Sequence, residues 1–169
     1  MQDYLTARGW LTEAERETLK KYAELAQVDT NHPLIINIGV EYGASLHCFR
    51  AGSLLADIVG IDLDVSKMEG FPRVELIAGD STDKKVAAQA GEAADILFID
   101  GGHTAGNVTA DIKLWSPKVL PGGMMLFHDY SPLEMHSGVV KAVDSWYAKN
   151  KQDWDLIEQV DPIRVYLRK

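Results

Sequence analysis

The stretch LIINIGVEYGASLHCF, residues 34–49, decides how the rest of the chain is interpreted. It opens with a short apolar run rich in β-branched residues, which is typical of a buried strand, and Gly39 closes that run. A helical pattern begins near Gly43. The stretch therefore predicts a strand, a tight turn and a helix whose free N–H groups point into the turn, where they favour an anionic group.

The spacing of the two glycines narrows the ligand that this turn could hold. Gly39 and Gly43 follow a Gly-x-x-x-Gly pattern, whereas a dinucleotide site has Gly-x-Gly-x-x-Gly and a phosphate-cradling loop ends in Gly-Lys-Ser/Thr. A carboxylate group fits this turn better than a diphosphate. The alternative is that the glycines only make a tight connection between a strand and a helix.

Four further apolar runs of strand length follow, most of them with an aspartate at or near the end. They are DIVGIDLD (57–64), RVELIAGD (73–80), ADILFIDGG (94–102) and GGMMLFHDY (122–130). A helical pattern separates the last two and stops at Pro117. Strands that alternate with helices predict a parallel sheet with right-handed crossovers.

Two shorter segments refine this pattern. Thr12 and Glu15 have the spacing of a capping box, so a first helix is expected from there to just before Asn31. The link VSKMEGFPRV (65–74) between the second and third strands is too short for a full crossover, so we expect a single helical turn there.

The C-terminal part of the chain predicts a different kind of pairing. A helical face runs from Val139 to Tyr147, and WDLIEQ (154–159) and IRVYLRK (163–169) follow it. Only a tight connection separates these two runs. They are expected to be antiparallel strands that close the sheet.

The 169 residues are 46% hydrophobic and 25% charged, which fits one globular domain over 1–169, with an N-terminal helical segment (1–30) and an α/β core (34–169). The net charge of −8 makes bulk nucleic acid a poor partner. Cys48 is the only cysteine, so neither an internal disulfide nor a thiolate metal cluster is expected. No apolar run reaches membrane-spanning length and no targeting segment is seen, so we expect a cytoplasmic protein without a membrane partner.

Polar residues at two strand ends point to a nucleoside. Asp62 ends the second strand about twenty residues after the glycine turn, where an acid commonly binds ribose hydroxyls. Asp80 and Ser81 end the third strand, where a carboxylate could accept a hydrogen bond from an exocyclic amine. Alone, an aspartate after a strand is more often a helix cap.

Taken in order, these features resemble a class I S-adenosylmethionine-dependent methyltransferase, of the small-molecule O-methyltransferase group that includes metal-dependent sugar, antibiotic and catechol enzymes. The segments that carry the resemblance are IINIGVEYGAS, GIDLD, AGDS and LFIDGGHTAGNVTADIKLWSPKVLPGGMMLFHDY. The resemblance implies an α/β, Rossmann-like doubly wound sheet of seven strands in the order 3-2-1-4-5-7-6. Strand 7 is then antiparallel, in agreement with the C-terminal hairpin, and helices cover both faces.

The resemblance also implies a site for S-adenosylmethionine. The residues that it assigns are, in chain order, Asn37, Gly39, Gly43, Ser45, Asp62, Asp80, Ser81 and Asp100. It places the residues from Asn37 to Ser45 around the methionine part of the cofactor and Asp62 on the ribose. Asp80 and Ser81 then lie on the adenine, and Asp100 lies beside the reacting methyl group. The family usually has an acid at position 37, and asparagine there can still accept a hydrogen bond from the cofactor's ammonium group.

The segment FIDGGHTAGN (98–107) is interpreted through the same resemblance. In metal-dependent sugar methyltransferases a similar acid-Gly-x-His stretch supplies a metal ligand and a histidine proposed as general base, here Asp100 and His103. His128 and Asp129, after the fifth strand, stand where the family places further ligands. The two aspartates offer hard oxygen donors that suit magnesium, whereas the softer His128 fits that role less well.

The expected reaction is methylation of a hydroxyl of a small molecule, a sugar or a catechol-like compound, with His103 removing the proton. His103 could instead cap the following helix. Competing interpretations of the whole chain are a nucleotide- or NAD-binding protein, or a catalytically silent S-adenosylmethionine-binding protein. A second copy of the chain could complete the acceptor pocket. Other side chains near the expected site are interpreted as packing or rim residues: Trp10, His47, Cys48, Met135 and His136.

Overall fold

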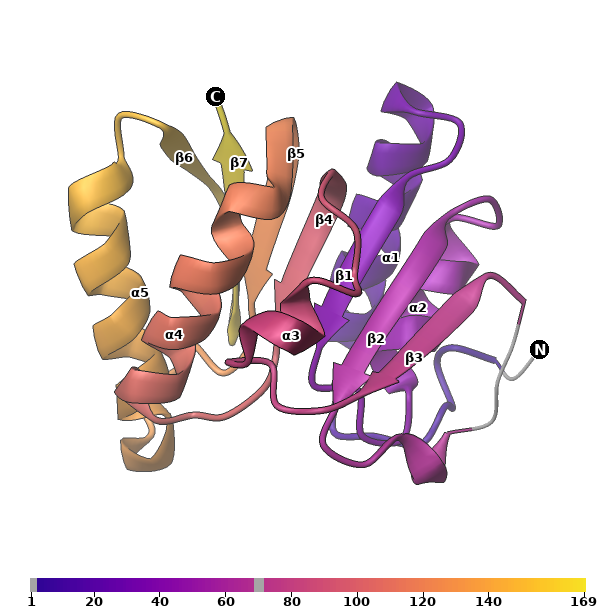
Figure 1. Cartoon of the computed structure of the whole chain (residues 1–169), viewed down its shortest axis with the longest axis horizontal. Coiled ribbons are helices and arrows are strands. Elements are labelled where there is room, and N and C mark those ends of the chain that lie inside the picture. Colours follow the sequence, from indigo (N-terminus) through magenta and orange to yellow (C-terminus); the bar gives the residue numbers. More distant parts are fainter. Residues whose placement is uncertain (1–2, 69–71) are drawn as a thin grey trace.

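The computed structural model describes residues 3–68 and 72–169, and its centre is a seven-stranded sheet (Figure 1). The strands are β1 (Leu34–Ile38), β2 (Asp57–Asp62), β3 (Val74–Ala78), β4 (Ala94–Ile99), β5 (Val119–Phe127), β6 (Trp154–Val160) and β7 (Ile163–Arg168). They lie in the order β3-β2-β1-β4-β5-β7-β6. β7 pairs antiparallel with β5 and β6, while the other pairs are parallel. The expected strand order and C-terminal hairpin are confirmed.

Helices cover both faces of the sheet, as expected (Figure 1). One face carries α1 (Glu13–Asp29) and α2 (Ala44–Gly52), and the other carries α3 (Lys84–Ala87), α4 (Ala105–Trp115) and α5 (Ser137–Asn150). Short 3-10 turns are η1 (Val65–Lys67), η2 (Ser116–Lys118) and η3 (Glu134–His136). η1 is the single turn expected between β2 and β3, and residues 69–71 of that link lie outside the described residues.

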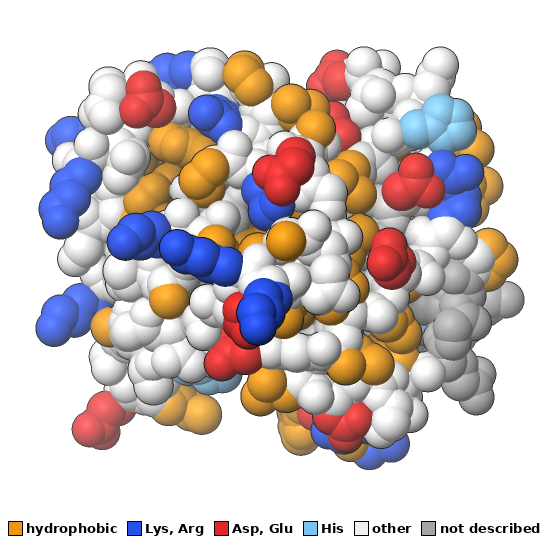
Figure 2. All heavy atoms as spheres, viewed as in Figure 1, with side chains coloured by type: hydrophobic (Ala, Val, Ile, Leu, Met, Phe, Trp, Pro, Cys, Tyr) orange, Lys and Arg blue, Asp and Glu red, His pale blue; other side chains and the backbone are white. Residues whose placement is uncertain are grey.

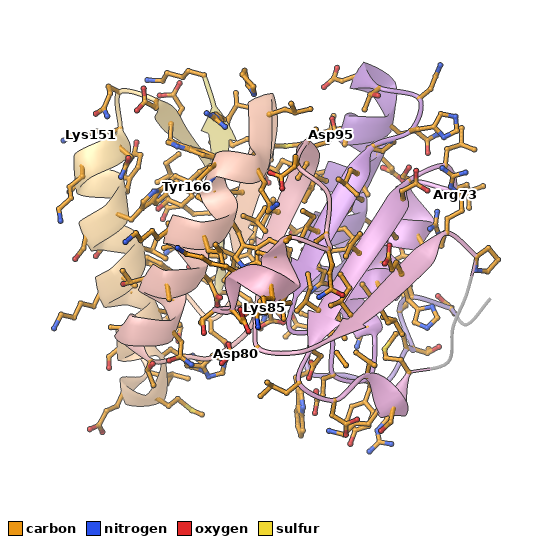
Figure 3. The ribbon with its side chains drawn as sticks, viewed as in Figure 1. Arg73, Asp80, Lys85, Asp95, Lys151 and Tyr166 are labelled. Atoms are coloured by element: carbon orange, nitrogen blue, oxygen red, sulfur yellow. The ribbon has the colours of Figure 1, made fainter. Side chains whose placement is uncertain are left out.

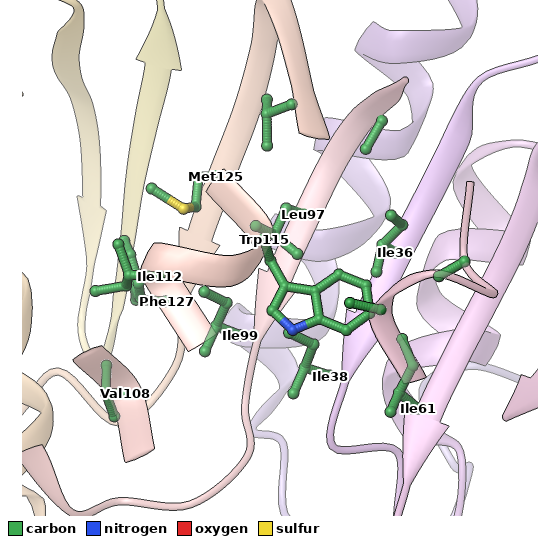
Figure 4. Packing of buried hydrophobic residues seen from close by; sticks show 14 of the residues in the cluster. Ile36, Ile38, Ile61, Leu97, Ile99, Val108, Ile112, Trp115, Met125 and Phe127 are labelled. Atoms are coloured by element: carbon green, nitrogen blue, oxygen red, sulfur yellow. The ribbon is translucent and has the colours of Figure 1, made fainter. Parts of the chain in front are cut away.

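Alternate strand residues feed two separate cores, because successive side chains of a strand point to opposite faces. Ile36 and Ile38 of β1 pack with Trp115 on the α4 side (Figure 4), whereas Ile35 packs with Phe49 on the α2 side. Each fully buried side chain of this size stabilises the fold by about 1.5–3 kcal/mol. The two cores fix the sheet from both sides and thereby hold its strand ends in place.

The molecular surface is mixed in charge. On the face covered by α3, α4 and α5, Lys and Arg side chains stand with Asp and Glu among them (Figure 2). Among the helices of the described ranges, none combines the length and the hydrophobicity needed to cross a membrane.

The polar strand ends gather along one edge of the sheet. Backbone hydrogen bonds from Asp100 N–H to the Ile38 carbonyl (2.9 Å) and from His128 N–H to the Ile99 carbonyl (3.1 Å) keep the ends of β1, β4 and β5 in register. Figure 3 shows Asp80 at this carboxyl-end edge, with Asp95 and Arg73 at the opposite edge. Ligands of open α/β sheets bind at the carboxyl ends of the strands.

Candidate active site

A cavity of about 610 Å³ opens at the carboxyl-end edge. Its walls come from the segment before α1, the turn after β1, the ends of β2, β4 and β5, and η3. The structure brings together these expected site residues in the lining: Gly39, Ser45, Asp62, Asp100, His103, His128 and Asp129. Asn37, Gly43, Asp80 and Ser81 are not part of it.

The turn after β1 requires both of its glycines. Gly39 and Gly43 have φ angles of +79° and +87°, in the left-handed region that side chains rarely adopt. A Cβ on Gly39 would lie 2.0 Å from the Asp100 carbonyl oxygen, so the turn packs directly on the end of β4. Gly43 caps α2 without a side chain, and the next two residues, Ala44 and Ser45, line the cavity. The first N–H groups of α2 therefore face a potential ligand.

Asp62 ties this turn to β2. Its Oδ2 accepts hydrogen bonds from the N–H groups of Val40 and Glu41, both at 2.9 Å, and its Oδ1 accepts one from Asp64 N–H at 3.1 Å. The side chain still lines the cavity. Carboxylate oxygens accept more than one hydrogen bond each, so Asp62 retains capacity for a ribose hydroxyl.

Asn37 lies below the turn, fully buried, rather than in the cavity wall. Its side-chain Nδ2 donates to the Gly39 carbonyl at 2.8 Å. Its Oδ1 is buried and lacks a hydrogen-bond partner in the part of the chain that the structure describes. Asn37 therefore supports the glycine turn and leaves one acceptor unused.

The two residues expected to bind adenine serve local structure here. The Asp80 carboxylate accepts hydrogen bonds from the N–H group (2.8 Å) and the hydroxyl (2.7 Å) of Thr82. The Ser81 carbonyl accepts a hydrogen bond from Trp115 Nε1 at 2.8 Å. Asp80 is exposed, and these hydrogen bonds lower its pKa. Their role toward a cofactor stays a prediction.

Three carboxylates surround the buried ring of His128. Nε2 lies 2.7 Å from Glu15 Oε1, while Nδ1 lies 2.9 Å from Asp100 Oδ1 and 3.2 Å from Asp129 Oδ2. Despite these short distances, Nδ1 has no partner in hydrogen-bond geometry among the described residues. The imidazole thus aims Nδ1 at two carboxylates without hydrogen-bond geometry to either.

Opposing effects set the charges of this cluster. Burial alone would lower the pKa of His128, but the contacts with Asp100, Asp129 and Glu15 outweigh it and raise the pKa to about 12. Burial opposes ionisation of Glu15 and Asp129, yet the bond with His128 contributes to a pKa below the usual range for both. Burial raises the pKa of Asp100, and His128 only partly offsets that rise. The cluster is therefore built around positive charge.

Two further imidazoles contact Asp129. His103 Nε2 lies 2.8 Å from Asp129 Oδ2, and His136 Nε2 lies 3.2 Å from Oδ1. Asp129 itself has a φ of +56°, a strained backbone conformation for a residue with a side chain. The alternative that His103 caps α4 is wrong, because the cap is Thr104, whose side chain accepts a hydrogen bond from Asn107 N–H.

The cluster of Asp100, His128 and Asp129 fits a divalent metal ion. One donor atom from each side chain lies within 4.8 Å of the others. The buried His128 Nδ1 lies near both carboxylates but has hydrogen-bond geometry with neither, and this observation supports the fit. The two carboxylates suit magnesium or manganese, and the imidazole shifts the preference toward manganese or zinc.

Sequence interpretation missed two members of this site. Glu15 was assigned only to a capping box, which the structure confirms, yet its carboxylate also pairs with His128, 113 residues away in the sequence. His136 was interpreted as a rim residue, although it contacts Asp129. No local pattern connects either residue with its partner.

Acidic side chains outnumber basic ones in the cavity lining. It contains five carboxylates (Glu15, Glu41, Asp62, Asp100 and Asp129) and three imidazoles (His103, His128 and His136), and none of its described residues is Lys or Arg. Such a lining attracts cations and repels phosphate groups.

Comparison with known proteins gives the family. A family model described as a methyltransferase domain matches residues 36–130. A protein of Sinorhizobium fredii (strain NBRC 101917 / NGR234), uncharacterized protein y4gI, is 28% identical over 126 residues, which cover 62% of this chain and 14% of that protein.

Solved structures with low sequence identity share the fold. MycE methyltransferase from the mycinamycin biosynthetic pathway, in complex with Mg, SAH and mycinamycin VI, has a TM-score of 0.74 and 19% identity, over 98% of this chain and 52% of MycE. The O-methyltransferase NovP has a TM-score of 0.73 and 17% identity, over 94% of this chain and 81% of NovP. This chain spans about half the length of MycE and a smaller part of y4gI.

Proposed function

The chain belongs to the methyltransferase-domain family, and from that premise we propose that it transfers a methyl group from S-adenosylmethionine to a hydroxyl oxygen of a small molecule. The acceptor is a sugar or a catechol-like compound with two neighbouring hydroxyls. A divalent metal ion and a histidine base assist the reaction. MycE, which shares the fold, has a structure that holds Mg, SAH and a mycinamycin, and this supports the pairing of cofactor and metal in the proposal.

The charge of the cavity carries this proposal. S-adenosylmethionine has a sulfonium cation, whereas NAD has a diphosphate with two negative charges. Near a protein surface, two unit charges 4 Å apart interact by about 4 kcal/mol. A lining with five carboxylates and, among the described residues, no Lys or Arg therefore favours the sulfonium compound over a dinucleotide.

The turn after β1 is suited to the methionine end of the cofactor. The first N–H groups of α2 and the Ser45 side chain stand at the cavity wall, where they can bind the cofactor's carboxylate. Asp62 stands on the same wall and is assigned to the ribose. Asn37 holds the turn through Gly39, and its role toward the ammonium group stays a prediction.

The reaction that we propose forms one O–C bond and breaks one S–C bond. S-adenosylmethionine, when bound, supplies a methyl group already activated by the sulfonium. A divalent ion held by Asp100, His128 and Asp129 would lower the pKa of an acceptor hydroxyl.

Two side chains of the protein are assigned to the removal of the acceptor hydroxyl proton. His103 Nε2 lies 2.8 Å from Asp129 Oδ2, so we assign the proton of the neutral ring to Nε2 and the basic lone pair to Nδ1. His103 is exposed at the mouth of the cavity, so a hydroxyl of the acceptor can reach it. We assign to His103 the removal of this proton and to Asp129 the orientation of the imidazole.

Turnover with and without metal tests the proposal. Metal-stripped protein is incubated with S-adenosylmethionine and catechol, and formation of the demethylated cofactor is measured. We expect no turnover in excess chelator, recovery with Mg²⁺ or Mn²⁺, and no recovery in Asp129→Asn. Asp153→Asn, which changes an exposed aspartate that is not part of the cavity lining, is the matched control.

Two outcomes would contradict parts of the proposal. Full turnover in excess chelator would remove the metal from the mechanism. Cofactor binding without turnover on catechols or neutral sugars would favour the catalytically silent alternative.

A further inference from the structure

His103 and His136 present two ring nitrogens to the two oxygens of one carboxylate. His103 Nε2 is 2.8 Å from Asp129 Oδ2, and His136 Nε2 is 3.2 Å from Oδ1. One donor atom from each of the three side chains lies within 4.8 Å of the others. Donors bound at about 2.0–2.1 Å to one tetrahedral ion are roughly 3.3 Å apart, so only small shifts are needed to enclose an ion.

The His136 ring is held in the orientation that this arrangement needs. Its Nδ1 lies 2.7 Å from Ser131 Oγ, so Nε2 is the nitrogen left to face Asp129. Ser131 is itself fixed by a hydrogen bond from its N–H group to the Asp129 carbonyl at 2.9 Å. A hydrogen bond on the far nitrogen is the usual support of a metal-binding histidine.

The backbone brings the two rings together. Gly138, in the first turn of α5, lies so close to the loop after β4 that a Cβ there would be 2.3 Å from the His103 carbonyl oxygen and 2.7 Å from Ala105 N. The ring centroids of His103 and His136 are 5.3 Å apart. The start of α5 and the loop after β4 are therefore packed in the position that pairs these rings.

We propose that His103, Asp129 and His136 form a second metal site that takes a first-row transition-metal ion such as Zn²⁺. It is distinct from the cluster of Asp100 and His128, with which it shares Asp129. Two imidazoles and one carboxylate are the donor set of zinc and its neighbours, whereas magnesium prefers oxygen ligands alone.

Occupancy of this site has a consequence for the reaction, which rests on the proposed function. An ion on Nε2 of His103 leaves the proton of the neutral ring on Nδ1, so that nitrogen no longer accepts the proton of the acceptor hydroxyl. Zinc is then an inhibitor of methyl transfer. The binding itself does not depend on any reaction and is measured without turnover.

Calorimetric titration of metal-stripped protein with Zn²⁺ tests the site. We expect His136→Gln to weaken zinc binding at least about tenfold, because one ligand is lost. Ser131→Ala, which frees the far side of the ring, is expected to weaken it about 10-fold or more. His32→Gln is the matched control, since its ring contacts Arg73 and is not part of the cavity lining.

A further variant separates the two sites. Asp100→Asn alters the first cluster and leaves the three ligands of the second, so zinc binding is retained. The proposal is overturned if His136→Gln and Ser131→Ala both bind zinc as the parent protein does, or if zinc binding depends on Asp100 and not on His136. His136 makes no side-chain cap to α5, so the variant is expected to fold, which its melting temperature checks.

Discussion

The two edges of the sheet contain buried polar groups of different character. At the amino-end edge, the buried Arg50 donates to the backbone carbonyls of Ser53, Leu54 and Arg73, at 2.9–3.0 Å. Also at that edge, Asp95 accepts a hydrogen bond from the N–H group of Leu34 at 2.8 Å. Side chains there complete the backbone's hydrogen bonds, although Arg50 Nε is buried without a hydrogen-bond partner among the described residues.

The carboxyl-end edge differs in where its unpaired polar atoms lie. Asn37 Oδ1 and His128 Nδ1 are buried without hydrogen-bond partners within the described ranges, and Asp129 holds a strained backbone. Unpaired buried groups cost about 1–3 kcal/mol each. The comparison indicates that side chains at the amino-end edge bind the backbone, whereas unpaired polar atoms at the carboxyl-end edge lie in the cavity wall (His128) or beneath its glycine turn (Asn37).

The largest expected effect is a loss of methyl-transfer rate on substitution of a residue at the carboxyl-end edge, with almost no change in the stability of the fold. His103→Ala should lower the rate of methyl transfer by about 10²–10⁴-fold, the usual contribution of a general base. His103 is exposed and does not cap α4, so the melting temperature should stay near that of the parent. Single-turnover kinetics and thermal melting of the same preparation measure both. A normal rate would mean that His103 is not the base.

The amino-end edge should show the reverse pattern. Arg50→Met leaves three backbone carbonyls without their donor, which should lower the free energy of unfolding by about 3 kcal/mol. The folded fraction should bind S-adenosylmethionine normally. Urea unfolding and calorimetry measure the two quantities. Weakened cofactor binding with unchanged stability would contradict the division between the edges.

Asp111, a buried aspartate of α4, gives a pH-dependent test of this comparison. Both carboxylate oxygens of Asp111 are buried without a hydrogen-bond partner among the described residues, and one is 3.6 Å from the place where a Cβ on Gly101 would lie. Burial raises the pKa of Asp111 to about 6, and Ser81 only partly offsets the rise. Between pH 4 and 6 the folded state thus binds more protons than the unfolded state, and stability falls as pH rises.

Asp111→Asn removes the titrating carboxyl group and with it this pH dependence of stability. Between pH 4 and pH 7 the parent should lose about 2–3 kcal/mol of unfolding free energy relative to the variant. Urea unfolding at several pH values measures it, with the exposed Asp153→Asn as control. A difference independent of pH would show that Asp111 ionises normally.

The sequence predicted the sheet and much of the site because both depend on regular spacing. Apolar runs located the strands, and the strand ends located Asp100, His128 and Asp129, which the sheet then brings together. The roles of these residues came from the resemblance to a family. The assignment of Asp80 to the adenine stays a prediction, and in the structure its carboxylate accepts hydrogen bonds from Thr82.

The rest of the site depends on contacts between segments far apart in the chain. Glu15 reaches His128 because α1 packs across the sheet, and His136 reaches Asp129 because α5 starts against the loop after β4. Periodicity shows which face of a helix is buried, but it does not show which loop that helix meets. These contacts required the three-dimensional structure.

Calorimetric titration with S-adenosylmethionine tests most directly whether the carboxyl-end edge is a cofactor site. We expect saturable binding with one site per chain and no binding of NAD. Asp62→Ala should weaken the binding by about 1–3 kcal/mol, because hydrogen bonds to a charged group are lost. Its melting temperature is measured alongside, since Asp62 also holds the turn. Binding of NAD in place of S-adenosylmethionine, or undiminished binding in Asp62→Ala, would contradict this assignment.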